Sequence, residues 1–323
     1  MLYEPKNNPP VDSGPAFQAP SKEPGQQGLV VLSLHSFLQQ KLRERGFLLF
    51  PIIPEQGLVL LYAPRGVGKT LLALAIALAI ASGSDLFQWE CSKPRAVLYI
   101  DGEMPATALQ ERLASLALGA GINSADSLFH LVTPDEQEFP LPNLAQPGGQ
   151  VLFEPYLAGV SLVVIDNLAC LCSAGRENET ESWQPVQRWL LDLRRRGISV
   201  LVVHHAGKSG DQRGTSARED VMDTVIALKR PEDYKPEQGA RFEVHITKSR
   251  GLAGKEIAPF EAQLRQEGAA FLWSYTKIND PQAEEVRELS GQGLSVRKIA
   301  DKTGLTKSKV HRMLKGGELA QEA

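Results

Sequence analysis

Eight consecutive residues near position 63 have the types and the order of a loop that binds phosphate. The run is Ala63-Pro64-Arg65-Gly66-Val67-Gly68-Lys69-Thr70, between two apolar stretches. It matches G-x-x-x-x-G-K-[ST], except that alanine stands at the first position. Gly66 and Gly68 let backbone N–H groups turn inward around phosphate oxygens, and the N-terminus of a following helix adds partial positive charge. We therefore predict that residues 63–70 bind a nucleotide.

The last two residues of this loop have side chains that suit specific ligands. Lys69 is expected to reach the β and γ phosphates of ATP, and the Thr70 hydroxyl is expected to ligate Mg²⁺. The predicted cofactors are therefore ATP and Mg²⁺. The alternative is a chance glycine-rich turn before a buried helix, which the strand–loop–helix order disfavours. Ala63 costs backbone freedom but removes no phosphate ligand.

Carboxylates follow two other apolar runs. Residues 161–166, S-L-V-V-I-D, end in Asp166, which we predict to hold Mg²⁺ through water. Residues 101–104, D-G-E-M, end another strand, and we predict that Glu103 polarises the attacking water. Asp101 is predicted to cap the helix that begins near Pro105. The alternative is that these carboxylates only cap helices, as Asp often does after a strand.

Two adjacent histidines end a further strand, in the run H-H-A-G-K from 204 to 208. A single histidine is usually structural. Two at the carboxyl end of a strand, where α/β sheets place their ligands, suggest a functional role. We predict that one of them senses the γ-phosphate.

Apolar runs alternate with helical patterns from about residue 57 to 276, which is typical of a mostly parallel sheet flanked by helices. The expected strands are 58–62, 96–101, 128–132, 162–166, 199–204, 224–229, 242–248 and 269–275, and the expected helices are 32–45, 70–81, 106–118 and 181–195. The last β runs have no helices between them, so antiparallel hairpins should end the sheet. We predict an α/β ATPase domain over residues 29–278.

Composition limits the class of protein. The chain has 323 residues and a net charge of −3, so nucleic-acid contact requires a local basic patch. Three cysteines suit a reducing compartment, and no secretory leader is recognisable, so we expect a cytoplasmic protein with no membrane association. Residues 1–28, rich in Pro, Gly, Gln and Ser, are expected to form a disordered tail.

Residues 282–317 are predicted to form a separate helix-turn-helix domain. Ser295 and Thr306 can cap its two later helices, and Gly304 stands at the turn. Residues 294–315 contain seven lysines or arginines and one aspartate, which favours DNA binding over the alternative of protein contact. The pattern resembles the helix-turn-helix of site-specific resolvases and invertases. The side chains predicted to contact DNA are Lys307, Ser308, Lys309 and Arg312.

The order of motifs over roughly residues 45–278 resembles the RecA-like ATPases of plasmid RepA-type hexameric helicases and bacterial replicative helicases. The motifs are A-P-R-G-V-G-K-T, L-Y-I-D-G-E-M, L-V-V-I-D-N, L-V-V-H-H-A-G-K, R-G-T-S and T-K-S-R-G. The resemblance implies a RecA-like fold, a homo-oligomeric ring such as a hexamer, ATP hydrolysis at subunit boundaries, and DNA threaded through the ring. Ala63 and the lack of a large N-terminal collar domain depart from the replicative helicases.

The same resemblance assigns roles to further residues. Glu103 matches the catalytic glutamate, Asp166 the Walker B aspartate, and His205 the sensor. Lys248 and Arg250 match a K-x-R finger that reaches a neighbouring subunit's site, the alternative being a solvated strand end. A basic loop with Lys208, Arg213 and Arg218 would face DNA, the alternative being an ordinary surface loop. A loop around 172–181 is acidic and suits phosphate less well.

Three functions are compatible with these residues. The first is an oligomeric DNA-dependent ATPase, a helicase or translocase of the plasmid replicative type. The second is a DNA-binding protein that ATP regulates, and the third is a recombination or repair ATPase without unwinding activity. The same core serves all three, so the residues leave the choice open.

Overall fold

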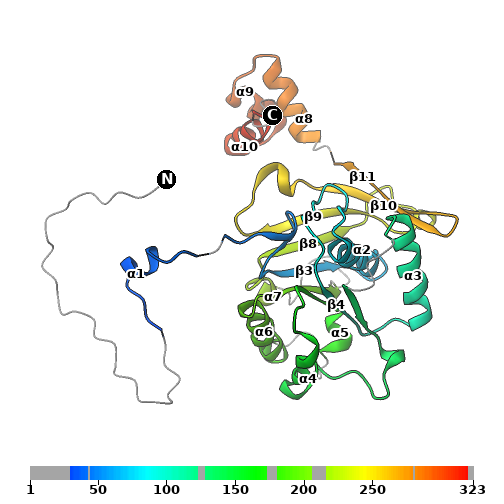
Figure 1. Cartoon of the computed structure of the whole chain (residues 1–323). Coiled ribbons are helices and arrows are strands. Elements are labelled where there is room, and N and C mark those ends of the chain that lie inside the picture. The colour runs from blue at the N-terminus through cyan, green and yellow to red at the C-terminus, as the bar shows by residue number, and fades with distance from the viewer. Residues whose placement is uncertain are drawn as a thin grey trace, which may run out of the picture. The chain divides into compact units, whose positions relative to one another are not determined.

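A nine-stranded sheet forms the centre of the protein in the computed structural model, which describes residues 30–42, 44–122, 128–172, 180–205, 216–278 and 281–318. Its order is β11-β10-β9-β8-β3-β7-β6-β4-β5 (Figure 1). The strands are β3 Leu58–Ala63, β4 Val97–Asp101, β5 Phe129–Val132, β6 Leu162–Asp166, β7 Ser199–His205, β8 Thr224–Lys229, β9 Arg241–Ser249, β10 Phe260–Glu267 and β11 Ala270–Lys277. Strands β3 to β8 are parallel, and β8 to β11 are antiparallel.

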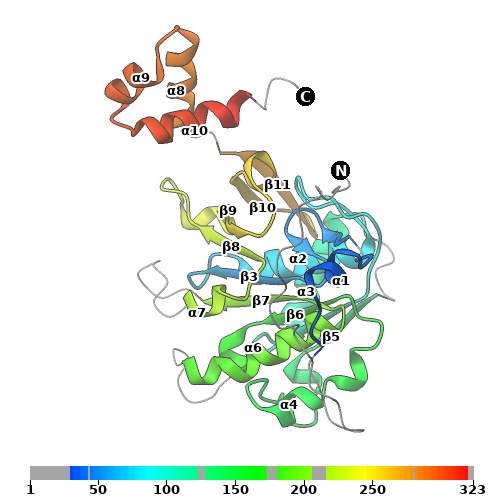
Figure 2. The ribbon, with the colours of Figure 1, turned by 90° about the vertical axis from the view of Figure 1, so that its left-hand side faces the viewer.

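Helices cover both faces of this sheet, because the central strands are apolar on both sides. Helices α2 (Lys69–Ser82) and α3 (Ala106–Gly119) pack on one face with Val59 and Leu61 of β3. Helices α5 (Leu168–Leu171) and α6 (Thr180–Arg195) pack on the other face with Leu58 and Leu60 (Figures 1 and 2). This mostly parallel, RecA-like sheet confirms the predicted fold class.

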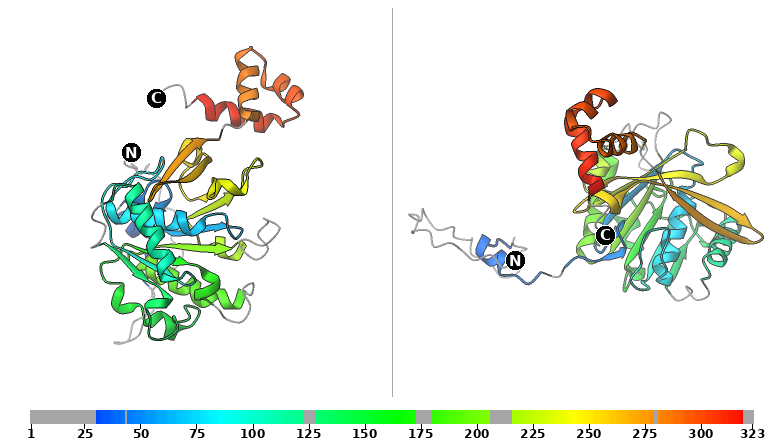
Figure 3. Two further views of the ribbon diagram at one scale, coloured as in Figure 1. Left: turned by 90° about the vertical axis from the view of Figure 1, so that its right-hand side faces the viewer. Right: turned by 90° about the horizontal axis from the view of Figure 1, so that it is seen from above.

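The parallel strands give the sheet two functional edges. We call the edge at which they end, next to α2, the carboxyl edge, and the edge at which they begin the amino edge. Since β9 runs antiparallel to β8, with Ser249 opposite Thr224, the end of β9 lies at the amino edge. Figure 3 shows the long β10–β11 hairpin that completes the antiparallel end of the sheet.

The structure agrees with all eight predicted strands, and it adds elements that the sequence did not reveal. Strand β10 and the small β1–β2 pair (Phe47–Leu49 and Ile53–Pro54) were missed. The helix expected over 32–45 is wrong in length: α1 spans only Leu34–Leu38, with Ser33 accepting from the Ser36 amide. A helix this short gains little from its own hydrogen bonds. The tail predicted at residues 1–28 lies outside the described residues.

Smaller helices complete the core: α4 (Pro147–Val151) and α7 (Ser216–Glu219), with short 3₁₀ turns at 134–136, 154–156, 236–238 and 254–257. None of the helices that the structure describes is both long enough and apolar enough to cross a bilayer.

The C-terminal helices form a small bundle with its own apolar core. They are α8 (Pro281–Gly291), α9 (Val296–Thr303) and α10 (Lys307–Glu318), and the core residues are Val286, Leu289, Ile299, Ala300 and Val310. Ser295 accepts from the Lys298 amide at 3.5 Å, and Gly304 has a φ of 70° at the turn. Thr306 accepts from the Lys309 amide at 3.3 Å. The predicted helix-turn-helix and its caps are confirmed.

Candidate functional site

The predicted phosphate loop joins the end of β3 to the start of α2 at the carboxyl edge. Gly66 and Gly68 have φ angles of 76° and 125°, which residues with side chains rarely adopt. A Cβ on Gly68 would also lie 2.8 Å from Cε1 of Phe242. The backbone therefore requires glycine at both positions, as the motif predicts.

Lys69 is buried at the base of this loop. Its Nζ donates to the carbonyls of Ala63 at 3.0 Å and Pro64 at 2.9 Å. Burial lowers the pKa of Lys69 to about 8, although Asp166 and Glu103 act in the opposite direction. The lysine is thus a cation with incomplete charge compensation, suited to a polyanionic ligand.

A cavity of about 450 Å³ opens above the loop. Its lining includes most of the residues predicted for nucleotide chemistry, from four separate segments of the chain. They are Arg65, Gly66, Gly68, Lys69, Thr70, Asp101, Glu103, Asp166 and His205. The fold therefore gathers at one place what the sequence offered as separate motifs.

Asp166 ends β6 with its carboxylate buried. It accepts hydrogen bonds from the Thr70 hydroxyl and, at 2.7 Å, from the Tyr99 hydroxyl. Burial raises the pKa of Asp166, while these two bonds lower it. A carboxylate beside a hydroxyl fits Mg²⁺, which takes hard oxygen ligands. The described residues contain no group of three or more His, Cys, Asp or Glu that could hold a metal, so phosphate and water would supply the remaining ligands.

The two carboxylates of the D-G-E-M run have different surroundings. Asp101 accepts from the Met104 amide at 2.9 Å, which confirms its capping role, and burial raises its pKa to about 6. The Glu103 side chain is 59% exposed and lines the cavity. Its Oε2 accepts from Nδ2 of Asn167 at 2.5 Å and lies 3.8 Å from Nε2 of His205. Glu103 is placed to act on a molecule in the cavity, and its role as the base stays a prediction.

Sequence reasoning missed Asn167 and Tyr99. Asn167 caps α5, accepting from the Cys170 amide at 3.2 Å while it donates to Glu103. Tyr99 is fully buried beneath Asp166. A polar residue directly after a Walker B aspartate was the available signal for Asn167. No local signal marks Tyr99, whose place in an apolar strand suggests packing alone.

The adjacent histidines point to different environments. His205 lines the cavity, as predicted for the sensor. His204 is buried, and Nη1 of Arg218 lies 2.7 Å from its Nε2. Burial and, second, the charge of Arg218 lower the pKa of His204 to about 3, so the ring is neutral.

The expectation that Arg218 faces DNA is wrong. Its side chain is 8% exposed, because it packs against His204 and lies 5.8 Å from the centre of the Trp183 ring. Lys208 and Arg213 of the same predicted loop lie outside the described residues.

Lys248 and Arg250 lie at the amino edge and line no part of the cavity that holds Lys69. Nζ of Lys248 donates to the carbonyls of Glu219 and Asp220, the latter at 3.3 Å. Nη2 of Arg250 donates to the Asp220 carbonyl at 2.9 Å. The fold therefore separates the predicted finger from its own phosphate loop.

An arginine that the sequence did not single out braces the phosphate loop. Nη2 of Arg230, at the end of β8, donates to the Gly66 carbonyl at 2.7 Å. Its Nη1 donates to the carbonyls of Gly239 and Arg241, and its guanidinium stacks 3.7 Å from the centre of the Tyr234 ring. The possible signal was its position at the carboxyl end of a strand beside β3.

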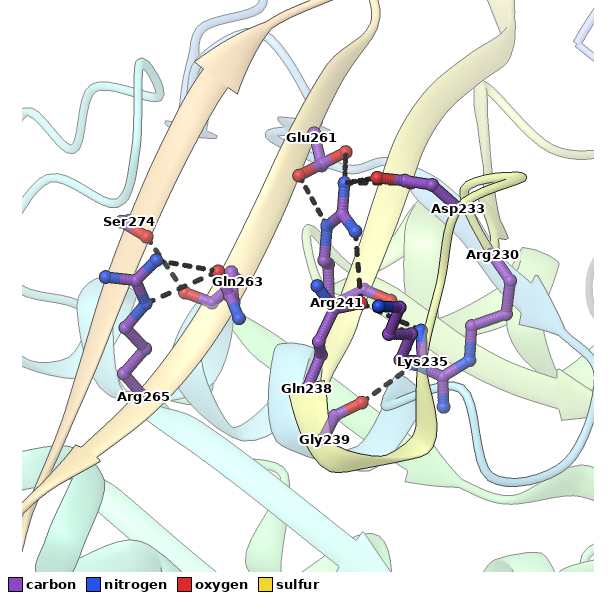
Figure 4. Close-up of polar contacts among 10 residues, drawn as sticks. All are labelled: Arg230, Asp233, Lys235, Gln238, Gly239, Arg241, Glu261, Gln263, Arg265 and Ser274. Carbon is purple, nitrogen blue, oxygen red and sulfur yellow. Dashed lines mark hydrogen bonds and ion pairs between the residues drawn. The ribbon is translucent and has the colours of Figure 1, made fainter.

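The turn that carries Arg230 is itself held by ion pairs. Arg241 bonds Glu261 at 2.8 Å and Asp233 at 3.0 Å, which fixes β9 to β10 and to the turn (Figure 4). Gln238 accepts a further bond from Arg241 at 3.0 Å. A rigid turn presents Arg230 to the phosphate loop in a fixed place.

In the helix-turn-helix bundle, Lys307, Ser308 and Lys309 are exposed on the first turn of α10. Nζ of Lys309 donates to Oε1 of Gln282 at 2.9 Å. The side chain of Arg312 lies outside the described residues. The exposed first turn agrees with a recognition helix, whose N-terminal residues contact base edges.

Comparisons with known proteins divide the chain at the same places. Residues 27–211 match the model of the AAA domain family, and residues 288–316 match the IclR helix-turn-helix domain. The match at the C-terminus is thus to the IclR type, where the sequence suggested resolvases. The plasmid RepA-type resemblance stays a prediction.

Two solved structures are similar to the chain. The first, the ATPase domain of a helicase, shares 16% identity over 68% of this chain and 85% of its own, with a TM-score of 0.48. The second, a KaiC-like protein from the hyperthermophilic archaeon Pyrococcus horikoshii OT3, shares 16% identity over 68% of this chain and 90% of its own, with a TM-score of 0.47.

Proposed function

We propose that this chain, which belongs to the AAA domain family, is an oligomeric DNA-dependent ATPase of the helicase or translocase kind. One observation carries the oligomeric part of the proposal. The phosphate-binding residues share one cavity at the carboxyl edge, whereas Lys248 and Arg250 lie at the amino edge. A finger in that position can act only on a nucleotide bound to another copy.

Each cavity residue has a definite task in this proposal. Lys69 binds the β and γ phosphates, and Thr70 and Asp166 hold Mg²⁺, which neutralises phosphate charge when bound. Glu103 accepts a proton from the attacking water, and Asn167 orients the carboxylate through its 2.5 Å hydrogen bond. His205, 3.8 Å from Glu103, is positioned to respond to the γ-phosphate. Arg250 of a neighbouring copy stabilises charge on the transferring phosphoryl group.

A subunit-mixing experiment tests the position of the finger. Arg250→Ala and Lys69→Ala are each expected to be nearly inactive alone. Mixed assemblies contain some interfaces with an intact phosphate loop on one copy and an intact finger on the next, so ATP turnover should partly return. If exchange of subunits is verified and turnover stays at the level of the single variants, the finger does not act between copies.

The helix-turn-helix supports DNA as the partner. Deleting residues 282–323 should leave basal ATP hydrolysis intact and weaken binding to duplex DNA. The intact protein should also lose duplex affinity more steeply with salt, since basic residues release counterions from phosphates. Equal affinity and equal salt dependence with and without this segment would favour a protein-contact role instead.

The IclR-type match also favours a second candidate, a DNA-binding regulator whose assembly ATP controls. The two functions differ in whether ATP drives strand separation. A forked DNA duplex labelled with a fluorophore and a quencher distinguishes them, since only the helicase would release the labelled strand in the presence of ATP.

A further inference from the structure

A buried carboxylate at the amino edge has contacts that no step at the phosphate site explains. Asp223 precedes β8 and is 1% exposed. Its Oδ2 accepts from the Leu58 amide at 2.9 Å, and its Oδ1 accepts from Nη1 of Arg45 at 3.1 Å. The Asp223 amide donates to the Leu58 carbonyl at 2.7 Å. These bonds fix the carboxylate to the start of the central strand β3.

Three guanidinium groups gather around this one carboxylate. Arg45 forms close hydrogen bonds with it, whereas Arg194 and Arg250 approach to 3.9 Å and 3.8 Å. The latter two distances exceed a hydrogen bond, so the attraction restrains these groups without using up their donors. Arg250 is 47% exposed and keeps donors for a second anion.

Asp223 and its neighbour Asp220 hold Arg250 at three points. The Arg250 amide donates to the Asp223 carbonyl at 2.9 Å, and its Nη2 donates to the Asp220 carbonyl at 2.9 Å. The third point is the Asp223 carboxylate beside Nη1. An arginine side chain alone has several freely rotating bonds, so such restraints reduce the entropy lost when it meets a phosphate.

We propose that Asp223 is the positioning residue of the Arg250 finger: from the base of β3 it aims the guanidinium at a nucleotide bound to a second copy. This inference rests on the proposed function, and it adds a residue that touches neither ATP nor the cavity. It links the amino edge of one copy to catalysis in the next, because the same side chain is anchored to the strand that carries the phosphate loop.

Asp223→Asn tests the proposal, since asparagine keeps an acceptor for the Leu58 amide and removes the charge that attracts Arg250. ATP turnover (kcat) should fall about tenfold or more, the scale of effect that misplacing a catalytic group produces. Affinity for a fluorescent ATP analogue should stay within about twofold, because the phosphate loop keeps its residues. Asp192→Asn is the matched control and should change neither quantity, since Asp192 also pairs with an arginine, Arg195 at 2.7 Å, but lies on the surface of α6.

Mixing separates the possible outcomes. Asp223→Asn should regain turnover when mixed with Lys69→Ala, and should regain none with Arg250→Ala, because both of those copies lack a working finger. Recovery on mixing with Arg250→Ala, or unchanged turnover of the single variant, would overturn the proposal. If Lys69→Ala and Arg250→Ala themselves fail to complement, the proposed function has failed, and a positioning role for Asp223 fails with it.

A folding check accompanies these measurements. Circular dichroism and thermal melting establish that each variant is folded. If Asp223→Asn does not fold, Asp223→Ser replaces it, because a hydroxyl can accept from the Leu58 amide while the charge is removed. The same mixing outcomes then decide the proposal.

Discussion

The two edges of the central sheet both concentrate charge, but they treat it differently. At the carboxyl edge, burial raises the pKa of Asp166 and lowers that of Lys69, so both charged forms are disfavoured where they stand. At the amino edge burial opposes the charge of Asp223, yet bonds from Arg45 and the Leu58 amide outweigh it and lower the pKa. One edge holds charges in need of partners, and the other supplies partners itself.

The difference distinguishes binding from positioning. Charges whose pKa values are shifted toward neutrality, around a cavity, are typical of a site that an ionic ligand completes. A carboxylate that its own chain compensates contributes to stability and fixes the groups around it. Comparing the edges therefore indicates where ATP and Mg²⁺ bind, and which residues act from a distance.

The largest effect should come from Lys69→Ala. The buried ammonium is the main fixed positive charge at the base of the cavity, so its loss should reduce ATP turnover by about 10²- to 10³-fold. Steady-state ATPase assays measure this, with the exposed Lys277→Ala as the control. Turnover close to wild type would mean that the carboxyl edge is not the phosphate site.

Glu103→Gln should bind ATP but hydrolyse it about 10²-fold more slowly, which is the typical yield of a positioned general base. Asp101→Asn is the matched change, and it should affect turnover less because Asp101 accepts a backbone hydrogen bond from Met104. Single-turnover hydrolysis separates chemistry from binding. If Asp101→Asn is the slower variant, the roles of the two carboxylates have been exchanged.

The residues that were predicted from the sequence are those whose role depends on local order. The phosphate loop is contiguous, and Asp166 ends an apolar run, so spacing along the chain reveals them. Arg230 and Asn167 act through partners 164 and 64 positions away, and only the strand order brings them together. Local patterns cannot report such contacts.

The same reasoning explains the missed strand β10. Only Phe260 and Ala262 are buried in it, and the remainder of the strand is polar and partly exposed. Its alternation is therefore too short to stand out, whereas the central strands are apolar throughout. Arg218 was misassigned for the opposite reason: basic residues are usually exposed, but its partner His204 provides a buried acceptor.

The pH dependence of ATP binding should reflect Lys69. With a pKa of about 8 in the free protein, the lysine is charged below that pH and loses its proton above it. Only the charged form attracts phosphate, so the Kd for ATP should be flat below pH 8 and rise by up to about tenfold per pH unit above it. Lys69→Arg stays charged throughout this range and should remove the slope. An equal slope in that variant would assign the titration to another group.

The smallest and most direct comparison is the same substitution at each edge. The raised pKa of Asp166 means that its charged form is disfavoured by folding, so Asp166→Asn should raise Tm at pH 7. The lowered pKa of Asp223 means that its charge stabilises the fold, so Asp223→Asn should lower Tm. An effect on the order of 1 kcal/mol shifts Tm by about 2 °C in a chain of this size.

The sign of each effect should also change with pH in a defined way. The penalty at Asp166 is present above its raised pKa and disappears as pH falls toward the unfolded value near 4. The contribution of Asp223 is present above that unfolded value and is lost as pH falls through its lowered pKa. Scanning calorimetry from pH 7 down to 4 should therefore show the gain from Asp166→Asn shrink while the loss from Asp223→Asn persists. If both variants shift Tm in the same direction at pH 7, the two edges do not differ in the way their charges are compensated.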